Sequence, residues 1–333
     1  MGATTPGGTP CTVVDASSAL RTMPALAARI TAAGHRLLWP ETPPRSAKDV
    51  REYINDADAV IAGGREPYGP DVLAAATRLR VIARTGVGYD QIDVPAASAR
   101  GIYVATTPGT LEGSVADHTL LLILAAARRL LPMDASVRQG AWERMSGWEL
   151  AGKRLGILGF GRIGREVARR AVPFGLAVSA YDPVPDRDAA RRLQVTLAAT
   201  WMEVTASADI VSLHLPLLPE LERFVSRDFL RRMKPGSILI NTARGALVDE
   251  AALYDALLAG HLRAAALDVL AVEPAGREHP LLRLPNVILT PHVASFTDEA
   301  WLRVVAMAVD NALAALDGRI PAGALNPSAR ARD

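Results

Sequence analysis

The chain has 333 residues, 50% of them hydrophobic and 22% charged, which suits about two globular domains and excludes a disordered chain. Its 37 basic and 35 acidic residues leave a net charge of +2 without a basic run, and 5% are aromatic, so we expect no nucleic-acid partner. A single cysteine, Cys11, excludes an intramolecular disulfide and a multi-thiolate site, and we expect no metal. Because neither a signal peptide nor an apolar run of membrane-spanning length is present, we expect a cytoplasmic protein without membrane association.

The first 105 residues alternate short β-branched runs with Ala-, Leu- and Arg-rich segments of helical period. This alternation is typical of βα units on a parallel sheet. The expected strands are residues 12–15, 59–62, 81–84 and 102–104, and the expected helices are residues 23–33, 47–55 and 70–76. One long helix is predicted from about residue 114 to 138, because leucines recur there at helical spacing, and a polar connection follows to residue 152.

A second βα series begins after this connection. Its expected strands are residues 154–158, 177–181, 210–214, 237–241, 264–269 and 286–290, and helices, for instance 162–171 and 250–259, lie between them. Six strands with intervening helices predict a doubly wound parallel sheet. A last helix is expected over residues 298–316, which leaves this sheet and returns to the first domain.

The most specific local motif is LGILGFGRIGR (155–165), which contains G-x-G-x-x-G at Gly159, Gly161 and Gly164. A plain glycine-rich turn is the alternative, but an apolar strand precedes the motif and a helix follows it, as in a dinucleotide-binding fingerprint. Gly159 permits a tight turn, Gly161 lets the backbone approach a pyrophosphate at the helix N-terminus, and Gly164 allows close helix–strand packing. Asp182 ends the next strand, where a carboxylate accepts hydrogen bonds from ribose hydroxyls and repels a 2′-phosphate. The motif therefore predicts NAD rather than NADP.

Chemically active side chains follow the later strands of this series. Arg244 stands in NTARG (241–245), Glu273 precedes Pro274, and His292 follows the last strand. In an open α/β sheet, ligands gather at these carboxyl ends. A guanidinium can bind a carboxylate through two hydrogen bonds, and a carboxylate beside an imidazole fixes its tautomer and favours its protonated form. The set suits proton donation to a bound oxo acid.

These motifs together resemble the NAD-dependent D-2-hydroxyacid dehydrogenase family, most closely its D-3-phosphoglycerate dehydrogenase and glyoxylate/hydroxypyruvate reductase branches. The resemblance runs from about residue 59 to 311. It rests on RTGVGYDQID (84–93), SVADHTLLLILAAAR (114–128), LGILGFGRIGREVA (155–168), DIVSLHLPLLPE (209–220), MKPGSILINTARGALVDEAAL (233–253), AALDVLAVEP (265–274) and NVILTPHVAS (286–295).

The resemblance implies a role for each matching residue. Arg244 would bind the substrate carboxylate and oxo group, His292 would be the acid/base, and Glu273 would support it. Asp268 would lie near the nicotinamide, although pairing with a nearby arginine is the alternative. The remaining residues implied to line the NAD site are Arg162, Ile163, His214, Thr242, Ala243, His292 and Ser295. The loop with Gly86, Val87 and Gly88 would cradle the substrate carboxylate, and His214 is expected to line the cofactor site or to be structural.

The resemblance also implies two Rossmann-like domains with doubly wound parallel sheets. A discontinuous substrate-binding domain would comprise residues 1–105 and 291–333, and the NAD-binding domain residues 106–290. The leucine-rich segment 114–138 is expected to form a homodimer contact, because family members use this helix for two-fold association; burial inside the monomer is the alternative. The expected reaction is reversible hydride transfer between NAD(H) and a small 2-hydroxy or 2-oxo acid.

Two departures from the family pattern lie beside the expected active site. Residues 110–113 read Thr-Leu-Glu-Gly without the usual asparagine, and Phe296 stands where small residues are usual. Arg84 precedes the glycine loop and is expected either to bind a second anionic group of a phosphoglycerate-like substrate or to pair with Asp90 or Asp93. The alternatives to a dehydrogenase of 2-hydroxy acids are an NAD-sensing, corepressor-like binding protein, which would keep the same triad, and a formate- or phosphite-oxidising enzyme.

Overall fold

The computed structural model describes residues 10–329 and divides into two compact units. Unit 1 comprises Met1–Leu111 and Asp298–Asp333, and unit 2 comprises Glu112–Thr297. Both crossings fall later in the chain than the boundaries near residues 105 and 290 expected from sequence. The reason lies in local hydrogen bonding: the amide of Thr106 donates to the carbonyl of Gly323 within unit 1, and the amide of Ala294 donates to Asp268 within unit 2.

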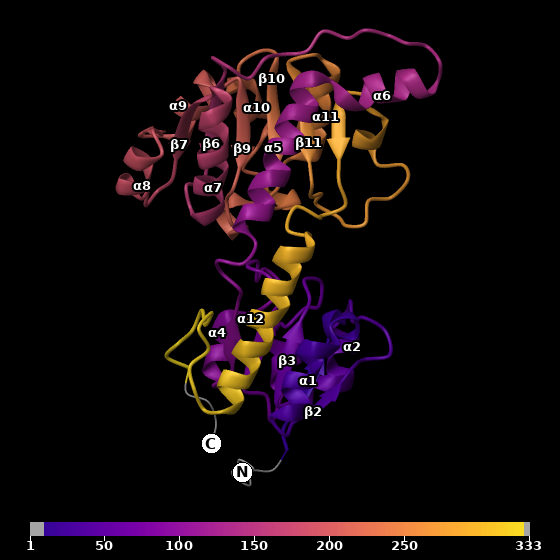
Figure 1. The fold of residues 1–333 in the computed structure, drawn as a ribbon, viewed down its shortest axis with the longest axis vertical. Coiled ribbons are helices and arrows are strands. Elements are labelled where there is room, and N and C mark those ends of the chain that lie inside the picture. Colours follow the sequence, from indigo (N-terminus) through magenta and orange to yellow (C-terminus); the bar gives the residue numbers. More distant parts are fainter. Residues whose placement is uncertain (1–9, 330–333) are drawn as a thin grey trace. The chain divides into compact units, whose positions relative to one another are not determined.

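Unit 1 is a five-stranded parallel sheet with helices on both faces, drawn from indigo to purple with a yellow C-terminal helix in Figure 1. Its strand order is β2-β1-β3-β4-β5, and its strands are β1 (Thr12–Asp15), β2 (Arg36–Leu38), β3 (Ala59–Ala62), β4 (Val81–Arg84) and β5 (Tyr103–Ala105). Helices α1 (Pro24–Ala32) and α12 (Asp298–Leu316) pack on one face. Helices α2 (Ala47–Ile54), α3 (Pro70–Ala75) and α4 (Val94–Ala99) pack on the other.

Helix α12 completes the core of unit 1, although it is far from the strands in sequence. Val305 and Val309 of α12 are fully buried among residues of β3 and β4 such as Ile61 and Ala83. Asn326, beyond the helix, accepts a hydrogen bond from the amide of Val104 in β5 (2.8 Å). The expected return of helix 298–316 to the first domain is therefore confirmed.

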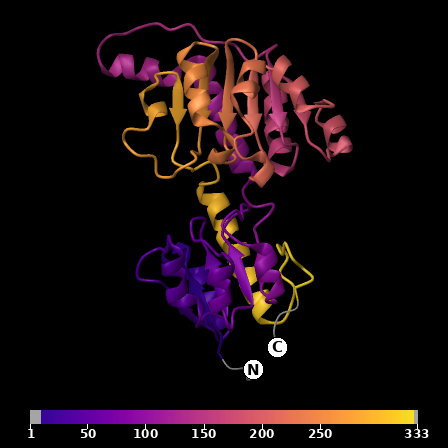
Figure 2. The ribbon, with the colours of Figure 1, turned by 180° about the vertical axis from the view of Figure 1, so that it is seen from behind.

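Unit 2 is a seven-stranded parallel sheet of order β12-β11-β10-β9-β6-β7-β8, seen from two sides in Figures 1 and 2. Its strands are β6 (Arg154–Leu158), β7 (Ala177–Tyr181), β8 (Thr196–Leu197), β9 (Ile210–Leu213), β10 (Ser237–Asn241), β11 (Leu262–Leu267) and β12 (Val287–Leu289). Helices α5 (Glu112–Arg128) and α7 (Arg162–Ala171) pack on one face. Helices α9 (Trp201–Ser207), α10 (Arg227–Arg232) and α11 (Glu250–Leu258) pack on the other, and α8 (Arg187–Arg192) precedes β8.

The direction of strand succession reverses at β6, which pairs with β7 on one side and with β9 on the other. Such a switch point opens a crevice at the carboxyl ends of the strands, where ligands bind in folds of this type. The α/β class with parallel sheets is confirmed. None of the helices in the described part of the chain combines the length and apolar character needed to cross a membrane.

The expected long helix over residues 114–138 is wrong in one respect, because it is two helices. Helix α5 ends at Arg128 and α6 (Leu130–Arg138) begins after Arg129, whose φ of 54° is left-handed and interrupts the helical hydrogen-bond ladder. Two strands were missed, β2 and β8. Both are short edge strands, with three and two residues, and neither carries a clear apolar alternation.

Candidate active site

The glycine motif joins β6 to α7 and has the shape of a phosphate cradle. Gly159 has a φ of +94°, and a Cβ there would lie 2.3 Å from the carbonyl oxygen of His214. A Cβ on Gly164 would lie 2.1 Å from the carbonyl oxygen of Gly159, so helix and strand approach too closely for any side chain. Gly161 is exposed with open space around its Cβ position, and it precedes Arg162 and Ile163 in the first turn of α7. These residues fit a dinucleotide pyrophosphate at the helix N-terminus.

Asp182 connects the end of β7 to this cradle. One carboxylate oxygen accepts a hydrogen bond from the amide of Phe160 (2.8 Å) and the other from the amide of Val184 (2.9 Å). Because each carboxylate oxygen has a second lone pair, Asp182 retains acceptor capacity for ribose hydroxyls. Its two amide contacts also give it a structural role in the glycine turn that the sequence did not reveal.

His214 lies at the end of β9, against the glycine turn. Its amide donates to the carbonyl of Leu158 (2.7 Å), and its Nε2 lies 2.9 Å from the hydroxyl of Ser212. Burial lowers the pKa of His214 to about 3. The imidazole is therefore neutral at pH 7, which favours a structural or cofactor-lining role over proton donation.

The His292–Glu273 pair is formed across two turns. His292 Nδ1 lies 2.8 Å from Glu273 Oε2, and the imidazole is about half exposed, with 46% of its side-chain surface accessible. His292 has a φ of 57°, a conformation that non-glycine residues seldom adopt and that is often found at functional sites. Glu273 also accepts a hydrogen bond from the amide of Leu270 (3.2 Å), which fixes its carboxylate within its own turn.

Asp268 holds the turn that carries His292. Its carboxylate accepts hydrogen bonds from the amides of Val293 (2.9 Å) and Ala294 (2.8 Å) and from the hydroxyl of Thr290. Its carbonyl accepts the amide of His292 (2.8 Å). Burial would raise the pKa of Asp268, but the hydrogen bonds from His118, Thr290 and the two amides outweigh burial and lower it. The alternative in which Asp268 pairs with an arginine is not supported, because the partners of its carboxylate among the described residues are Thr290, His118 and two backbone amides.

The turn that carries Arg244 follows β10 and approaches the turn of Glu273. Asn241 accepts from the amide of Ala243 (3.0 Å) and donates to the carbonyl of Arg244 (2.8 Å), which closes a tight turn. A Cβ on Gly245 would lie 1.9 Å from the carbonyl carbon of Leu270, so only glycine permits this approach. Since β10, β11 and β12 are adjacent parallel strands, the three predicted catalytic residues come from neighbouring strand ends.

The remaining predicted site residues are divided between the two units, with the cofactor-lining residues in unit 2 and the substrate-binding loop in unit 1. Thr242 and Ala243 are buried beside Arg244, and Ser295 follows the Ala294 turn. Gly86, Val87 and Gly88 lie in unit 1, after β4, where the carbonyl of Gly86 accepts from the amide of Thr107 (3.1 Å). Arg84 donates to the carbonyl of Thr85 (2.6 Å), and Asp93, one of the partners proposed for it, caps α4 by accepting from Ala96 (2.8 Å).

Comparison with known proteins identifies the family of this chain. Residues 120–294 match the model of the D-isomer specific 2-hydroxyacid dehydrogenase, NAD binding domain. A glyoxylate reductase of Korarchaeum cryptofilum is 41% identical over 87% of this chain and 89% of the relative. This chain is a D-isomer specific 2-hydroxyacid dehydrogenase.

Further relatives of this dehydrogenase span several substrates. The D-3-phosphoglycerate dehydrogenase of Mycobacterium bovis is 41% identical over 86% of the chain, which covers only 54% of that relative's length. The structure of a D-lactate dehydrogenase from Aquifex aeolicus complexed with NAD and lactic acid superposes with a TM-score of 0.81 at 27% identity, covering 92% of this chain and 96% of that one. The predictions of the family, of an NAD-dependent oxidoreductase and of NAD as cofactor are confirmed.

The structure also reveals residues at the dehydrogenase site that sequence reasoning missed. They are Ser114, His118, Thr119, Asn241, Gly245 and Thr290. The sequence did hold a signal for three of them. Ser114, His118 and Thr119 are polar residues on one largely apolar helix, at spacings of four and one. Their partners lie more than a hundred residues away in the chain, so the pattern alone did not show what they contact.

Proposed function

We propose that this chain reduces a small 2-oxo acid to the corresponding 2-hydroxy acid, with Arg244, Glu273 and His292 as its catalytic set. The observation that carries the proposal is the 2.8 Å contact between His292 and Glu273 at strand ends adjoining the Arg244 turn. The nicotinamide, when bound, supplies the hydride. His292 then provides the proton that the substrate oxygen takes up as its negative charge develops.

Each of the three side chains has a separate task. Glu273 accepts a hydrogen bond from the Nδ1–H group of His292, which leaves Nε2, directed away from the carboxylate, as the proton donor. The guanidinium of Arg244 binds the substrate carboxylate through paired hydrogen bonds and polarises the adjacent carbonyl. In the oxidation direction the same imidazole, in its neutral form, accepts the hydroxyl proton.

NAD is the preferred cofactor in this proposal, and Asp182 supports the preference. Its carboxylate stands at the end of β7, beside the glycine cradle, where NADP would place a 2′-phosphate. Like charges a few ångströms apart repel strongly in a partly desolvated site. The residues proposed to line the cofactor are the cradle glycines, Arg162, Ile163, His214, Thr242, Ala243, Asp268 and Ser295.

The substrate is proposed to bind the glycine loop of unit 1 through its carboxylate, with Gly86, Val87 and Gly88 offering backbone amides. Arg84 would bind a second anionic group, as in a phosphoglycerate-like acid. Arg84→Ala should then raise KM for a phosphorylated or dicarboxylic 2-oxo acid while leaving glyoxylate nearly unaffected. An unchanged ratio of kcat/KM between the two substrates would show that Arg84 is structural and would favour the small-acid reductase.

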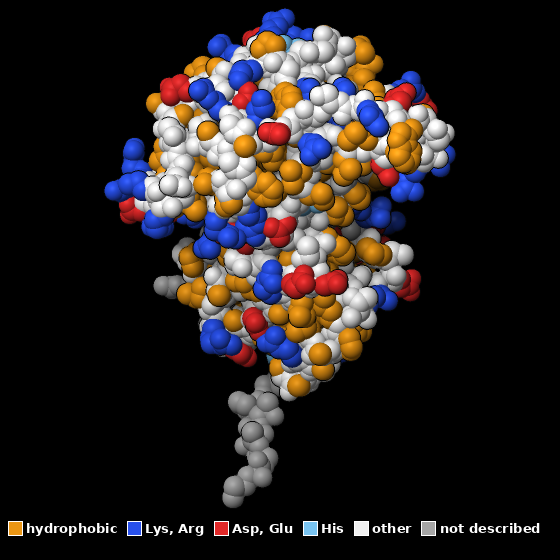
Figure 3. Space-filling model, turned by 45° about the horizontal axis from the view of Figure 1, so that its top comes forward, with side chains coloured by type: hydrophobic (Ala, Val, Ile, Leu, Met, Phe, Trp, Pro, Cys, Tyr) orange, Lys and Arg blue, Asp and Glu red, His pale blue; other side chains and the backbone are white. Residues whose placement is uncertain are grey.

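We also propose a cytoplasmic homodimer. Helix α6 and the segment after it expose large apolar side chains, including Leu130, Leu131, Val137 and Trp142, the last of which is 70% exposed. Figure 3 shows how, on one face of the molecule, apolar side chains stand between charged ones. An exposed apolar group of this kind on α6 and the segment after it supports a contact with a second copy of the chain. A single cysteine suits a reducing compartment.

The proposed activity is tested with a panel of 2-oxo acids that includes phosphorylated members. Loss of NADH absorbance at substrate-dependent rates would support the reductase. Binding of NADH without turnover of any member of the panel would instead support the NAD-sensing protein. Turnover of formate or phosphite with NAD, and of no 2-oxo acid, would support the remaining alternative.

A further inference from the structure

The first half of α5 contacts both turns that carry the proposed catalytic residues. Ser114 donates a hydrogen bond to the carbonyl of Ala294 (3.0 Å), two residues after His292, and this contact is buried. The amide of the same residue, Ala294, donates to Asp268. The two peptide groups that flank Ala294 are thus both fixed. Ser114 of α5 holds the carbonyl of Ala294, and Asp268, which follows β11, holds its amide.

His118, one helical turn after Ser114, reaches the same turn by its side chain. Its Nε2 lies 3.0 Å from the hydroxyl of Thr290 and 3.5 Å from the carboxylate of Asp268. The hydroxyl proton of Thr290 is donated to Asp268, so Thr290 can only accept from His118. His118 therefore carries its proton on Nε2 and donates it into the Thr290–Asp268 pair.

Thr119 connects α5 to the other turn. Its hydroxyl lies 3.0 Å from that of Thr242, two residues before Arg244, and both side chains are buried. Because Thr119 donates its own proton to the carbonyl of Val115 (2.7 Å), Thr242 must be the donor in the pair. The orientation of the Thr242 hydroxyl is thus set by α5.

We propose that Ser114, His118 and Thr119, which we call the α5 polar face, are positioning residues for the dehydrogenase reaction. They hold the Arg244 turn and the His292 turn to one rigid helix, so that the substrate-binding guanidinium and the proton-donating imidazole keep a fixed relative position. This inference rests on the proposed function of Arg244 and His292. Catalytic groups displaced by about 1 Å can lose roughly a hundredfold in rate, which makes such a support functionally significant.

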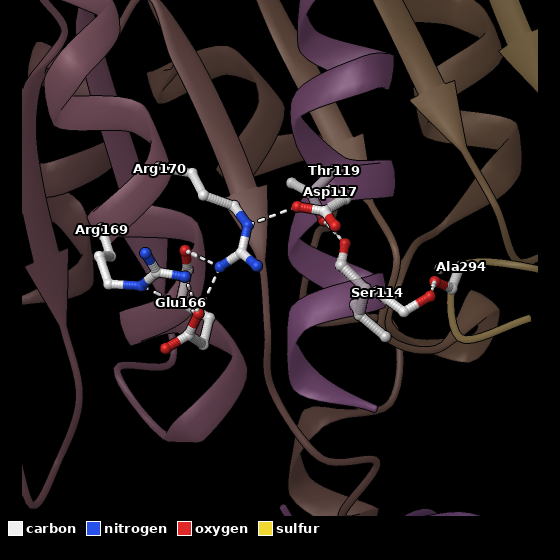
Figure 4. Close-up of polar contacts among 8 residues, drawn as sticks. Ser114, Asp117, Thr119, Glu166, Arg169, Arg170 and Ala294 are labelled. Atoms are coloured by element: carbon white, nitrogen blue, oxygen red, sulfur yellow. Dashed lines mark hydrogen bonds and ion pairs between the residues drawn. The ribbon is translucent and has the colours of Figure 1, made fainter. Parts of the chain in front are cut away.

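The same stretch of α5 offers a matched control. Figure 4 shows the contact of Ser114 with Ala294 beside the contact of Asp117 with Arg170. Asp117 pairs with Arg170 of α7, which also pairs with Glu166. This network joins α5 to α7 at the surface, and Asp117 is 69% exposed. Asp117→Asn therefore perturbs the same turn of α5 without touching either catalytic turn.

The kinetic test compares five substitutions at three positions in the full-length protein, using the 2-oxo acid that the panel identifies. His118→Leu should lower kcat by roughly 10- to 100-fold with little change in KM for NADH, and His118→Gln, which keeps a donor, should recover most of the loss. Thr119→Val should raise KM for the oxo acid, because Arg244 binds its carboxylate, and Thr119→Ser should restore it. Asp117→Asn should keep kcat within about twofold. Equal losses in Asp117→Asn and His118→Leu, or no loss in either, would overturn the inference.

A second measurement does not depend on turnover. Amide hydrogen exchange of the peptide spanning residues 290–296 should accelerate in Ser114→Ala and His118→Leu and stay unchanged in Asp117→Asn. Unchanged exchange in all three variants would overturn the positioning role even in a protein that proved inactive toward every 2-oxo acid. An inactive wild-type protein with accelerated exchange in the two variants would overturn the proposed function and support the structural part of the inference. Failure of one proposal is thus distinguishable from failure of the other.

Discussion

Replacing Asp268 by asparagine tests how the His292 turn is held. In the wild-type protein the buried carboxylate accepts hydrogen bonds on both oxygens, from Val293 and Ala294 among others. Asparagine keeps one acceptor oxygen and puts an NH₂ group in place of the other. If the remaining oxygen faces Val293, the new NH₂ group faces the amide of Ala294, and two donors oppose each other in a buried site.

The size of the loss follows from these contacts. One hydrogen bond to a charged acceptor contributes about 1.5–3 kcal/mol, and a buried donor left without a partner costs about 1–3 kcal/mol. The neutral amide avoids the desolvation cost of the carboxylate, which offsets part of this sum. We therefore expect Asp268→Asn to lower the free energy of unfolding by about 2–4 kcal/mol.

Urea unfolding followed by tryptophan fluorescence measures this loss. The transition of unit 2 can be recognised because added NADH shifts it to higher urea. Asp228→Asn is the matched control: Asp228 pairs with Arg231 at the surface and is 81% exposed, so its loss should stay below about 1 kcal/mol. A loss for Asp268→Asn no greater than that of the control would refute the assigned role of the carboxylate.

Acidification gives the same reasoning an independent test. The pKa of Asp268 is lower in the folded protein than in the unfolded chain, where it is about 3.9. The carboxylate therefore stabilises the fold above the unfolded pKa, and that contribution is lost as the pH falls through the folded pKa. The difference in stability between wild type and Asp268→Asn should be constant above about pH 5 and should shrink below pH 4.

Three further predictions concern the proposed reaction and assembly. His292→Ala should reduce kcat by roughly 10²–10⁴-fold with NADH affinity nearly unchanged, and a kcat close to that of the wild type, with chemistry rate-limiting, would contradict the assignment. Asp182→Ala should narrow the preference for NADH over NADPH. It should also weaken the binding of both cofactors, because the amide of Phe160 loses its hydrogen-bond acceptor. A wild-type kcat/KM with NADPH equal to that with NADH would contradict the role of Asp182. Light scattering at micromolar concentration should give twice the chain mass of 35.3 kDa, and a monomeric mass would count against the α6 contact.

The parts of the fold that the sequence predicts well are those written in short-range patterns. The run at β6, the three glycines and the start of α7 are contiguous, so strand, turn and helix signals reinforce one another there. The candidate catalytic residues could be proposed from the sequence because Arg244 and His292 each stand three residues after an apolar strand, Glu273 lies in the turn after the strand between them, and parallel strands end at the same edge of a sheet. The spacing of Gly159, Gly161 and Gly164 was enough to predict a cofactor site, because all three glycines lie in one contiguous strand–turn–helix segment.

What the sequence did not predict depends on contacts between distant segments. The partners of Asp268 include two backbone amides, which leave no trace in residue type. The break at Arg129 is marked only indirectly, by Pro132 in the first turn of α6, because proline is tolerated at the start of a helix and disfavoured in its interior; the left-handed residue itself is an arginine rather than a glycine. Ser114 and His118 share a helix face, but the turn they hold is about 170–180 residues further along the chain.

The place of α12 in unit 1 has a consequence for synthesis of the chain. Residues 298–316 cover one face of β3 and β4, yet they leave the ribosome only after all of unit 2 has been made. Unit 2 is continuous in sequence and can close its core first, while the nascent first unit waits with buried positions such as Ile61 and Ala83 open to solvent. The last segment translated thus completes the first domain begun, and a nascent chain that stalls before Asp298 displays an apolar sheet face of the kind that chaperones bind.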